Sequence, residues 1–264
     1  MITLLKNAGS QCNKLIKITT MKFFKIIILS LGTCTISCIY FSCTKTTPHV
    51  ASTDSNFSNS TMVQVFDATV KSTRNYIYVD GVPVSGAAVA AGGVFPATAF
   101  AFKVNGGLRS FLIKDTSASS IQLPLAFAEN MQVGRSYTIF TYDTITSPKQ
   151  ATILNNIVVP TDTTSRLRFA NFIYNTTAVP NVDVYSFRRG ASTPVFSNVA
   201  TTQVTDFIPY ASGLTDTLYV YAAGTTSPLL VKSLVTSLTP QRSYSAAYNG
   251  SYKVTKTVTT FVTY

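Results

Sequence analysis

Apolar and polar residues alternate in short runs along most of the chain after Ser60, a pattern typical of β-strands. The runs are rich in aromatic and β-branched residues, and turn-forming pairs such as Asp80-Gly81 separate them. No window of about 12 residues shows a capped 3.6-residue period, so we expect no helix there. The clearest runs are 62–66, 75–79, 100–104, 137–142, 167–172, 182–185, 217–221 and 252–262.

The two halves of this strand-rich region resemble each other. Two pairs of segments carry the resemblance: 75–81 with 182–190, and 133–143 with 240–250. In both pairs the second segment lies 107 residues after the first, as with Tyr78 and Tyr185. A shared offset favours an internal repeat over chance similarity. We therefore expect two tandem domains, residues 61–160 and 165–264, joined by a short polar linker.

A charge-free apolar run, residues 26–41, follows Lys22 and Lys25 near the N-terminus. Basic residues followed by an apolar run are the order found in secretory signal peptides. With 16 residues the run is shorter than the roughly 20 that a membrane-spanning helix needs. Residues 1–20 fit no part of a signal peptide, so we expect translation to start at Met21.

The end of the apolar run resembles the lipobox of bacterial lipoproteins, in which a cysteine is acylated and becomes the mature N-terminus. Ser42 precedes Cys43 here, although Tyr40 stands where the common pattern has leucine. We expect Cys43 to be the lipidated residue, with Cys38 as the second candidate. An uncleaved anchor and ordinary secretion are the alternatives to lipidation.

The segments that follow from this assignment are a signal region, residues 1–43, and a polar tether, residues 44–60. The net charge of +11 is partly explained by five lysines that precede Cys43. The remaining 16 basic and 10 acidic residues are scattered and carry no nucleic-acid-binding motif. We therefore expect a membrane as partner, through the N-terminal lipid anchor, and no nucleic acid.

The residues that usually perform catalysis are scarce. His49, the only histidine, falls in the expected tether, which excludes a histidine-based hydrolase site or zinc site in the folded part. Glu129 is the only glutamate, and most aspartates border turns, where they bond to the local backbone. Asp67 and Asp183 lie in or beside strands instead. We expect no enzyme activity, no cofactor and no metal; a catalytic pair of aspartates is the less favoured alternative.

Aromatic residues recur at alternate positions, which places two rings on one face of a strand. Packing into the core is one interpretation of these pairs, and an exposed platform for a glycan or a protein is the other. The pairs are Tyr76 with Tyr78, Phe100 with Phe102, and Tyr219 with Tyr221.

The stretch "RLRFANFIYNTTAVPNVDVYSF" (166–187) and the segment 226–250 are similar to the bacterial domain of unknown function 4397 (DUF4397). Residues 181–185 keep that family's opening strand and residues 133–138 keep its later turn and strand. Lys71-Ser72-Thr73 departs from the family pattern. The resemblance implies an exported β-sandwich of immunoglobulin-like or transthyretin-like type and no established activity.

These observations predict an all-β protein with two tandem immunoglobulin-like or transthyretin-like β-sandwich domains after a signal peptide and a flexible tether. We expect it to be anchored through Cys43 in the cell envelope, in the outer membrane of a Gram-negative bacterium. The expected role is binding, adhesion or structure, with an envelope glycan or protein as partner. A glycan-binding accessory protein that uses exposed tyrosines is the first alternative, and a carboxylate-dependent enzyme is the second.

Overall fold

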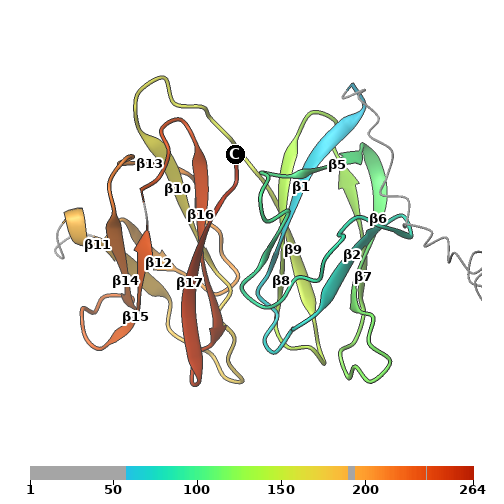
Figure 1. Ribbon diagram of the computed structural model, residues 1–264. Helices are drawn as coiled ribbons and strands as arrows, with labels where there is room; N and C mark the ends of the chain where they lie inside the picture. Colours follow the sequence, from blue (N-terminus) through green and yellow to red (C-terminus); the bar gives the residue numbers. More distant parts are fainter. Residues whose placement is uncertain (1–57, 190–193, 236) are drawn as a thin grey trace, which may run out of the picture. The chain divides into compact units, whose positions relative to one another are not determined.

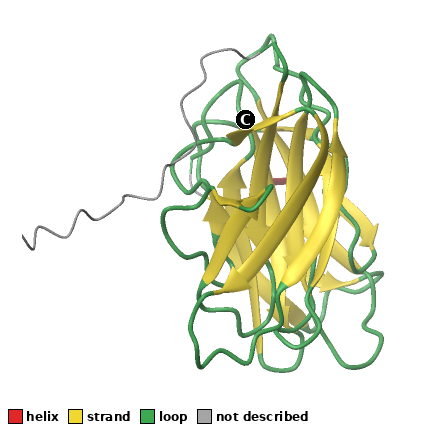
Figure 2. Cartoon of the chain, turned by 90° about the vertical axis from the view of Figure 1, so that its right-hand side faces the viewer, coloured by secondary structure: helices red, strands yellow, loops and turns green. Residues whose placement is uncertain are grey.

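The computed structural model describes residues 58–189, 194–235 and 237–264, and strands make up nearly all of their regular structure (Figure 1, Figure 2). The exception is one 3-10 turn, η1 (Phe187–Arg189). Within these ranges no helix has the length and apolarity needed to cross a bilayer. The prediction of an all-β chain is confirmed, whereas the predicted signal region, Cys43 and the tether to residue 57 lie outside the described residues.

The first half of the described chain forms two sheets. One sheet has the order β4-β1-β8-β9, with β5 also paired to β1, and the other has the order β3-β2-β6-β7. The strands of the first sheet are β1 (Ser60–Asp67), β4 (Val94–Phe95), β5 (Phe102–Asn105), β8 (Ser136–Tyr142) and β9 (Lys149–Leu154). Those of the second are β2 (Asn75–Val79), β3 (Val82–Pro83), β6 (Gly107–Asp115) and β7 (Leu125–Met131).

The second half also forms two sheets, in the orders β13-β10-β16-β17 and β12-β11-β14-β15. The strands of the first of these are β10 (Ser165–Asn171), β13 (Ile208–Tyr210), β16 (Ser243–Ser251) and β17 (Thr255–Val262). Those of the second are β11 (Val182–Ser186), β12 (Phe196–Val199), β14 (Asp216–Ala222) and β15 (Leu229–Val235).

Strand pairing shows that the two halves share a topology. β1 runs parallel to β8 just as β10 runs parallel to β16, and β2 pairs with β6 just as β11 pairs with β14. Ile77 lies opposite Ile113, and the residues 107 positions later, Val184 and Val220, also lie opposite each other. The similarity between the two halves of the sequence therefore corresponds to a structural repeat.

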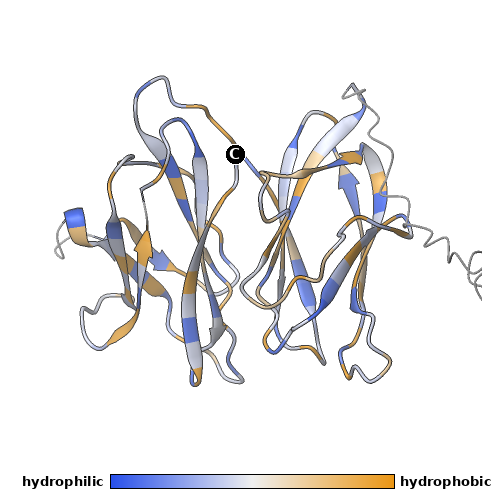
Figure 3. Cartoon of the chain, viewed as in Figure 1, coloured by the Kyte–Doolittle hydropathy of each residue, from blue (hydrophilic) through white to orange (hydrophobic). Residues whose placement is uncertain are grey.

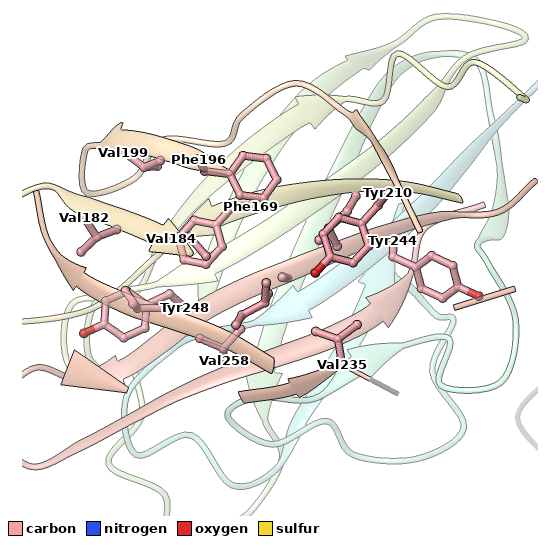
Figure 4. Close-up of a cluster of buried hydrophobic side chains, with 14 of the residues drawn as sticks. Phe169, Val182, Val184, Phe196, Val199, Tyr210, Val235, Tyr244, Tyr248 and Val258 are labelled. Atoms are coloured by element: carbon pink, nitrogen blue, oxygen red, sulfur yellow. The ribbon is translucent and has the colours of Figure 1, made fainter. Parts of the chain in front are cut away.

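Each half has its own apolar core, because alternate side chains of its two sheets point toward each other. In Figure 3, hydrophilic and hydrophobic residues mix along the strands, as expected when only one face of a strand is in the core. The first core includes Val63, Ile77 and Ile139. The second includes Phe169 and Val184, and Figure 4 shows its side chains from several strands meeting in one cluster.

A third apolar cluster joins the halves. Phe66 stacks on Phe261 with 5.0 Å between ring centroids, and Phe140 stacks on Phe172 at 4.5 Å. These rings come from the sheet faces opposite to the two cores, so residues of both halves pack as one compact unit. Whether each half folds alone is a separate property, and the division into domains 61–160 and 165–264 stays a prediction. The finer immunoglobulin-like or transthyretin-like assignment also stays a prediction.

Candidate functional site

The tyrosines of β14 lie on the outer face of their sheet. Leu218 and Val220 point into the second core and are fully buried, so the alternating residues Tyr219 and Tyr221 point the other way, where each is partly exposed. Packing into the core was one of two interpretations of this pair, and it is wrong here. Both faces of the strand are apolar in sequence, but leucine and valine take the inward positions.

The other aromatic pairs divide between the two interpretations. Tyr76 and Tyr78 are partly exposed, because Ile77 occupies the core between them. Phe102 does pack against the first core. Phe100 is more than one-third exposed.

Three tyrosines and one phenylalanine form what we call the tyrosine face: Tyr185, Phe187, Tyr219 and Tyr221. Tyr185 lies opposite Tyr219 in the strand register, and its ring meets that of Tyr221 edge-on, at 5.7 Å and 80°. The ring of Phe187 lies 6.4 Å from that of Tyr219, and Phe187 is 69% exposed. Tyr185 is buried, with 7% of its surface exposed, whereas Tyr219 and Tyr221 are partly exposed. The hydroxyls of Tyr219 and Tyr221 have no hydrogen-bond partner within the described chain.

The surroundings of the tyrosine face are poor in free negative charge. Lys232 lies opposite Tyr219 in the register of β15. The carboxylate of Asp183 accepts hydrogen bonds from the backbone N–H groups of Asn198 and Gly224, both at 2.7 Å. This carboxylate is therefore already used to hold strand β12 and the turn after β14, on either side of β11.

The tyrosine face belongs to the second half alone. At the matching positions of the first half, Tyr78 lies opposite Leu112, and Lys114 takes the place of the third tyrosine. The Lys114 ammonium sits 5.2 Å from the centroid of the Tyr78 ring. The two halves therefore share their core positions but differ on this outer face.

Asp67 holds a buried network at the start of the β1–β2 connection. Its two carboxylate oxygens accept hydrogen bonds from the Thr69 N–H, the Ser72 and Thr141 hydroxyls, and the Asn75 amide, at 2.6–2.9 Å. All of its partners belong to the first half of the fold. Asp67 therefore acts as a structural hub.

Asp216 is the corresponding hub of the second half. It accepts hydrogen bonds from the hydroxyls of Ser186 and Tyr210, both at 2.5 Å, and from two backbone N–H groups. Burial alone would raise the pKa of Asp216, but these hydrogen bonds to the charged form lower it below the usual value. Asp216 therefore stays ionised as an acceptor.

Two further described aspartates form ion pairs, and these pairs lie at separate turns. Asp80 pairs with Arg109 at 3.0 Å and Asp143 pairs with Lys149 at 2.7 Å, each at its own turn. Among residues 58–189, 194–235 and 237–264, no group of three acidic, histidine or cysteine side chains is arranged to hold a metal ion. His49 and the cysteines lie outside the described residues.

Part of the tyrosine face could be predicted from the sequence. Alternation identifies Tyr219 and Tyr221 as neighbours on one face, and the repeat aligns Tyr185 with Tyr78. Phe187 gives no periodic signal because it lies in the 3-10 turn after β11. Comparison of the whole chain with protein-family models and with curated proteins gave no match.

Proposed function

We propose that this protein is a non-catalytic binding protein of the cell envelope, and that the tyrosine face binds a neutral glycan. The observation that supports this most is the exposure of Phe187 and the partial exposure of Tyr219 and Tyr221 on the outer side of the β11–β14–β15 sheet. The described chain gives the hydroxyls of these two tyrosines no partner. Apolar faces that a fold exposes rather than buries are commonly interaction sites.

The chemistry of the face favours a sugar. A pyranose ring presents axial C–H groups that pack on aromatic faces, and a tyrosine hydroxyl adds a hydrogen bond at the edge. A flat strand face accommodates an extended chain of sugars better than a compact ligand. No unpaired carboxylate of β11, β14 or β15 is available to attract a cation, so the expected ligand is not cationic.

A protein partner is the second candidate, and two side chains favour it. Phe187 is 69% exposed and Leu234, on the neighbouring strand β15, is 60% exposed. Large apolar side chains at the rim of an aromatic patch are typical of protein interfaces.

The proposal is tested by retention on a panel of immobilised neutral polysaccharides. The variant carries Tyr219→Ala with Tyr221→Ala, and the matched control carries Tyr76→Ala with Tyr78→Ala. We expect wild type and control to be retained by at least one polysaccharide and the variant to be released. Equal retention of all three proteins contradicts the assignment of the face.

Anchoring in the envelope through Cys43 is part of the same proposal. We expect Cys43→Ser to abolish incorporation of labelled fatty acid and to move the protein from the membrane to the soluble fraction. Cys38→Ser is the control and leaves both unchanged. Loss of labelling in the Cys38 variant alone would transfer the anchor to that residue.

A further inference from the structure

A cavity of about 590 Å³ opens between the turn before β8, the segment after β9 and the residues that follow β17. Arg135 is the only charged side chain among the residues that line it, and no described acidic side chain faces it. The Arg135 guanidinium has no hydrogen bond within the described chain. A second guanidinium, that of Arg242, stacks on the ring of Phe100, which lines the cavity, at 4.5 Å. One guanidinium therefore lines the cavity and a second lies against its wall.

Behind this cavity lies Arg168, which is only 2% exposed. Its Nε donates to the Ser245 hydroxyl at 2.8 Å, its terminal Nη2 donates to the Thr138 hydroxyl at 3.0 Å, and its plane covers the ring of Phe207. The described chain gives it no carboxylate partner. A buried charge without a counter-charge is costly, and such groups recur where the charge has a function.

Two chains of hydrogen bonds, which we call arms, lead away from Arg168. The first arm ends at the cavity. The guanidinium only donates, so the Thr138 hydroxyl must direct its own proton elsewhere, and it donates to the Asn155 carbonyl oxygen at 3.0 Å. The Asn155 amide then donates to the Ser136 hydroxyl at 3.0 Å. Ser136 lines the cavity, and its remaining proton is free to point into it.

The second arm has the same direction. Ser245 accepts from Arg168, and its only other partner is the hydroxyl of Thr263, at 2.7 Å. Ser245 is fully buried, so its proton is satisfied only if it goes to Thr263. Thr263 also lines the cavity and is left with a proton to donate. In both arms each group therefore donates its hydrogen bond toward the cavity, away from the buried charge.

We propose that this cavity is an anion-binding site, in which the hydroxyls of Ser136 and Thr263 and the guanidinium of Arg135 converge on a carboxylate or phosphate group. The shared chemistry of the ligand is an oxyanion carried on an apolar or aromatic body. The apolar part of the wall supports this, since it includes Met62, Ile157 and Val158. Arg168 acts as a positioning residue, because it touches the two hydroxyl relays and not the ligand.

The experiment is a calorimetric titration of the full chain with phenyl phosphate and with benzoate, using benzamide as the neutral probe. We expect binding of one or both anions and none of benzamide. Ser136→Ala and Arg135→Gln are each expected to weaken anion binding about tenfold, since each removes one hydrogen bond to a charged group. Which anion binds more tightly tells a phosphate ligand from a carboxylate ligand.

Two controls keep the test decisive. Arg74→Gln removes an exposed charge that does not line the cavity, and we expect wild-type affinity. Arg135→Gln changes an exposed side chain, so loss of binding there does not arise from misfolding. Equal binding of benzamide, unchanged affinity in both cavity variants, or no binding of either anion overturns the proposal. None of these outcomes bears on the tyrosine face.

Discussion

Arg168 carries a charge into the contact between the two halves. Burial lowers its pKa well below the usual value, to about 9, because the charged form loses hydration and the described chain gives it no carboxylate. The guanidinium is still charged at neutral pH. In an unfolded chain the same group keeps its usual, higher pKa, so above pH 9 and up to that usual pKa the unfolded state binds more protons than the folded state. Stability from this group therefore rises as the pH rises above 9.

The variant Arg168→Met tests the free-energy cost of burying the charge of Arg168. Ser245 and Thr138 keep their hydrogen bonds to Thr263 and Asn155, so we expect the unfolding free energy at pH 7 to fall by less than about 1 kcal/mol, or to rise. Between pH 9 and 10, the free energy of unfolding of wild type should rise relative to that of the variant by up to about 1.4 kcal/mol. Urea unfolding of both proteins at pH 7, 9 and 10 measures the difference. Parallel pH dependence contradicts the lowered pKa of Arg168.

Sequence reasoning had no means of finding this residue. Arg168 was visible only as one of several scattered basic residues, because its partners Thr138 and Ser245 lie 30 and 77 positions away along the chain. The bond to Ser245 follows from the pairing of β10 with β16, and the bond to Thr138 follows from the contact between two sheets, and local patterns encode neither.

At the scale of elements, the turns that precede β8 and β16 share one tyrosine contact. The hydroxyl of Tyr137 accepts a hydrogen bond from the Gln132 N–H, and that of Tyr244 accepts one from the Thr239 N–H. Such a tyrosine corner ties the start of a strand to the turn before it. The turns differ at three aligned positions, one of which is in the left-handed region.

Gly134 occupies the left-handed region of the first turn, with φ of 73°, whereas Gln241 occupies it in the second, with φ of 60°. A side chain in that region is strained, so we expect Gln241→Gly to raise the free energy of unfolding by about 0.5–1 kcal/mol. A Cβ added at Gly134 would meet no atom within 4 Å. Gly134→Ala is therefore a control for backbone strain alone and should lower stability by about 1 kcal/mol. Chemical denaturation measures both, and a loss of stability in Gln241→Gly contradicts the account.

Strand prediction succeeded where alternation and β-forming residues coincided. The run 75–79 became β2 with the same bounds, and 182–185 became most of β11. β7 was not predicted, because Ala126, Ala128 and Glu129 have low strand preference. It is a strand because β6 offers it a long pairing edge. Which face of a strand turns inward also escaped prediction, since both faces of β14 are apolar.

At the scale of the whole molecule, the third apolar cluster couples the halves. Phe172 is fully buried and stacks on Phe140 of the other half, outside the second core. We expect wild type to unfold in one transition and Phe172→Ala to unfold in two, after losing about 3–5 kcal/mol of packing. Differential scanning calorimetry shows the number of transitions.

Val220→Ala is the matched control, because it weakens the second core and leaves the cluster intact. We expect one transition at a lower temperature. Two transitions in wild type, or a single one in Phe172→Ala, would show that the cluster does not couple the halves.

We propose that the tyrosine face of the second half is the binding surface of the molecule. An NMR titration of the full chain with a neutral polysaccharide fragment retained on the panel tests it most directly. We predict shifts confined to β11, β14 and β15 and centred on Tyr219 and Tyr221. Shifts confined to the β2–β6–β7 sheet, or to the cavity lined by Arg135, would contradict the claim.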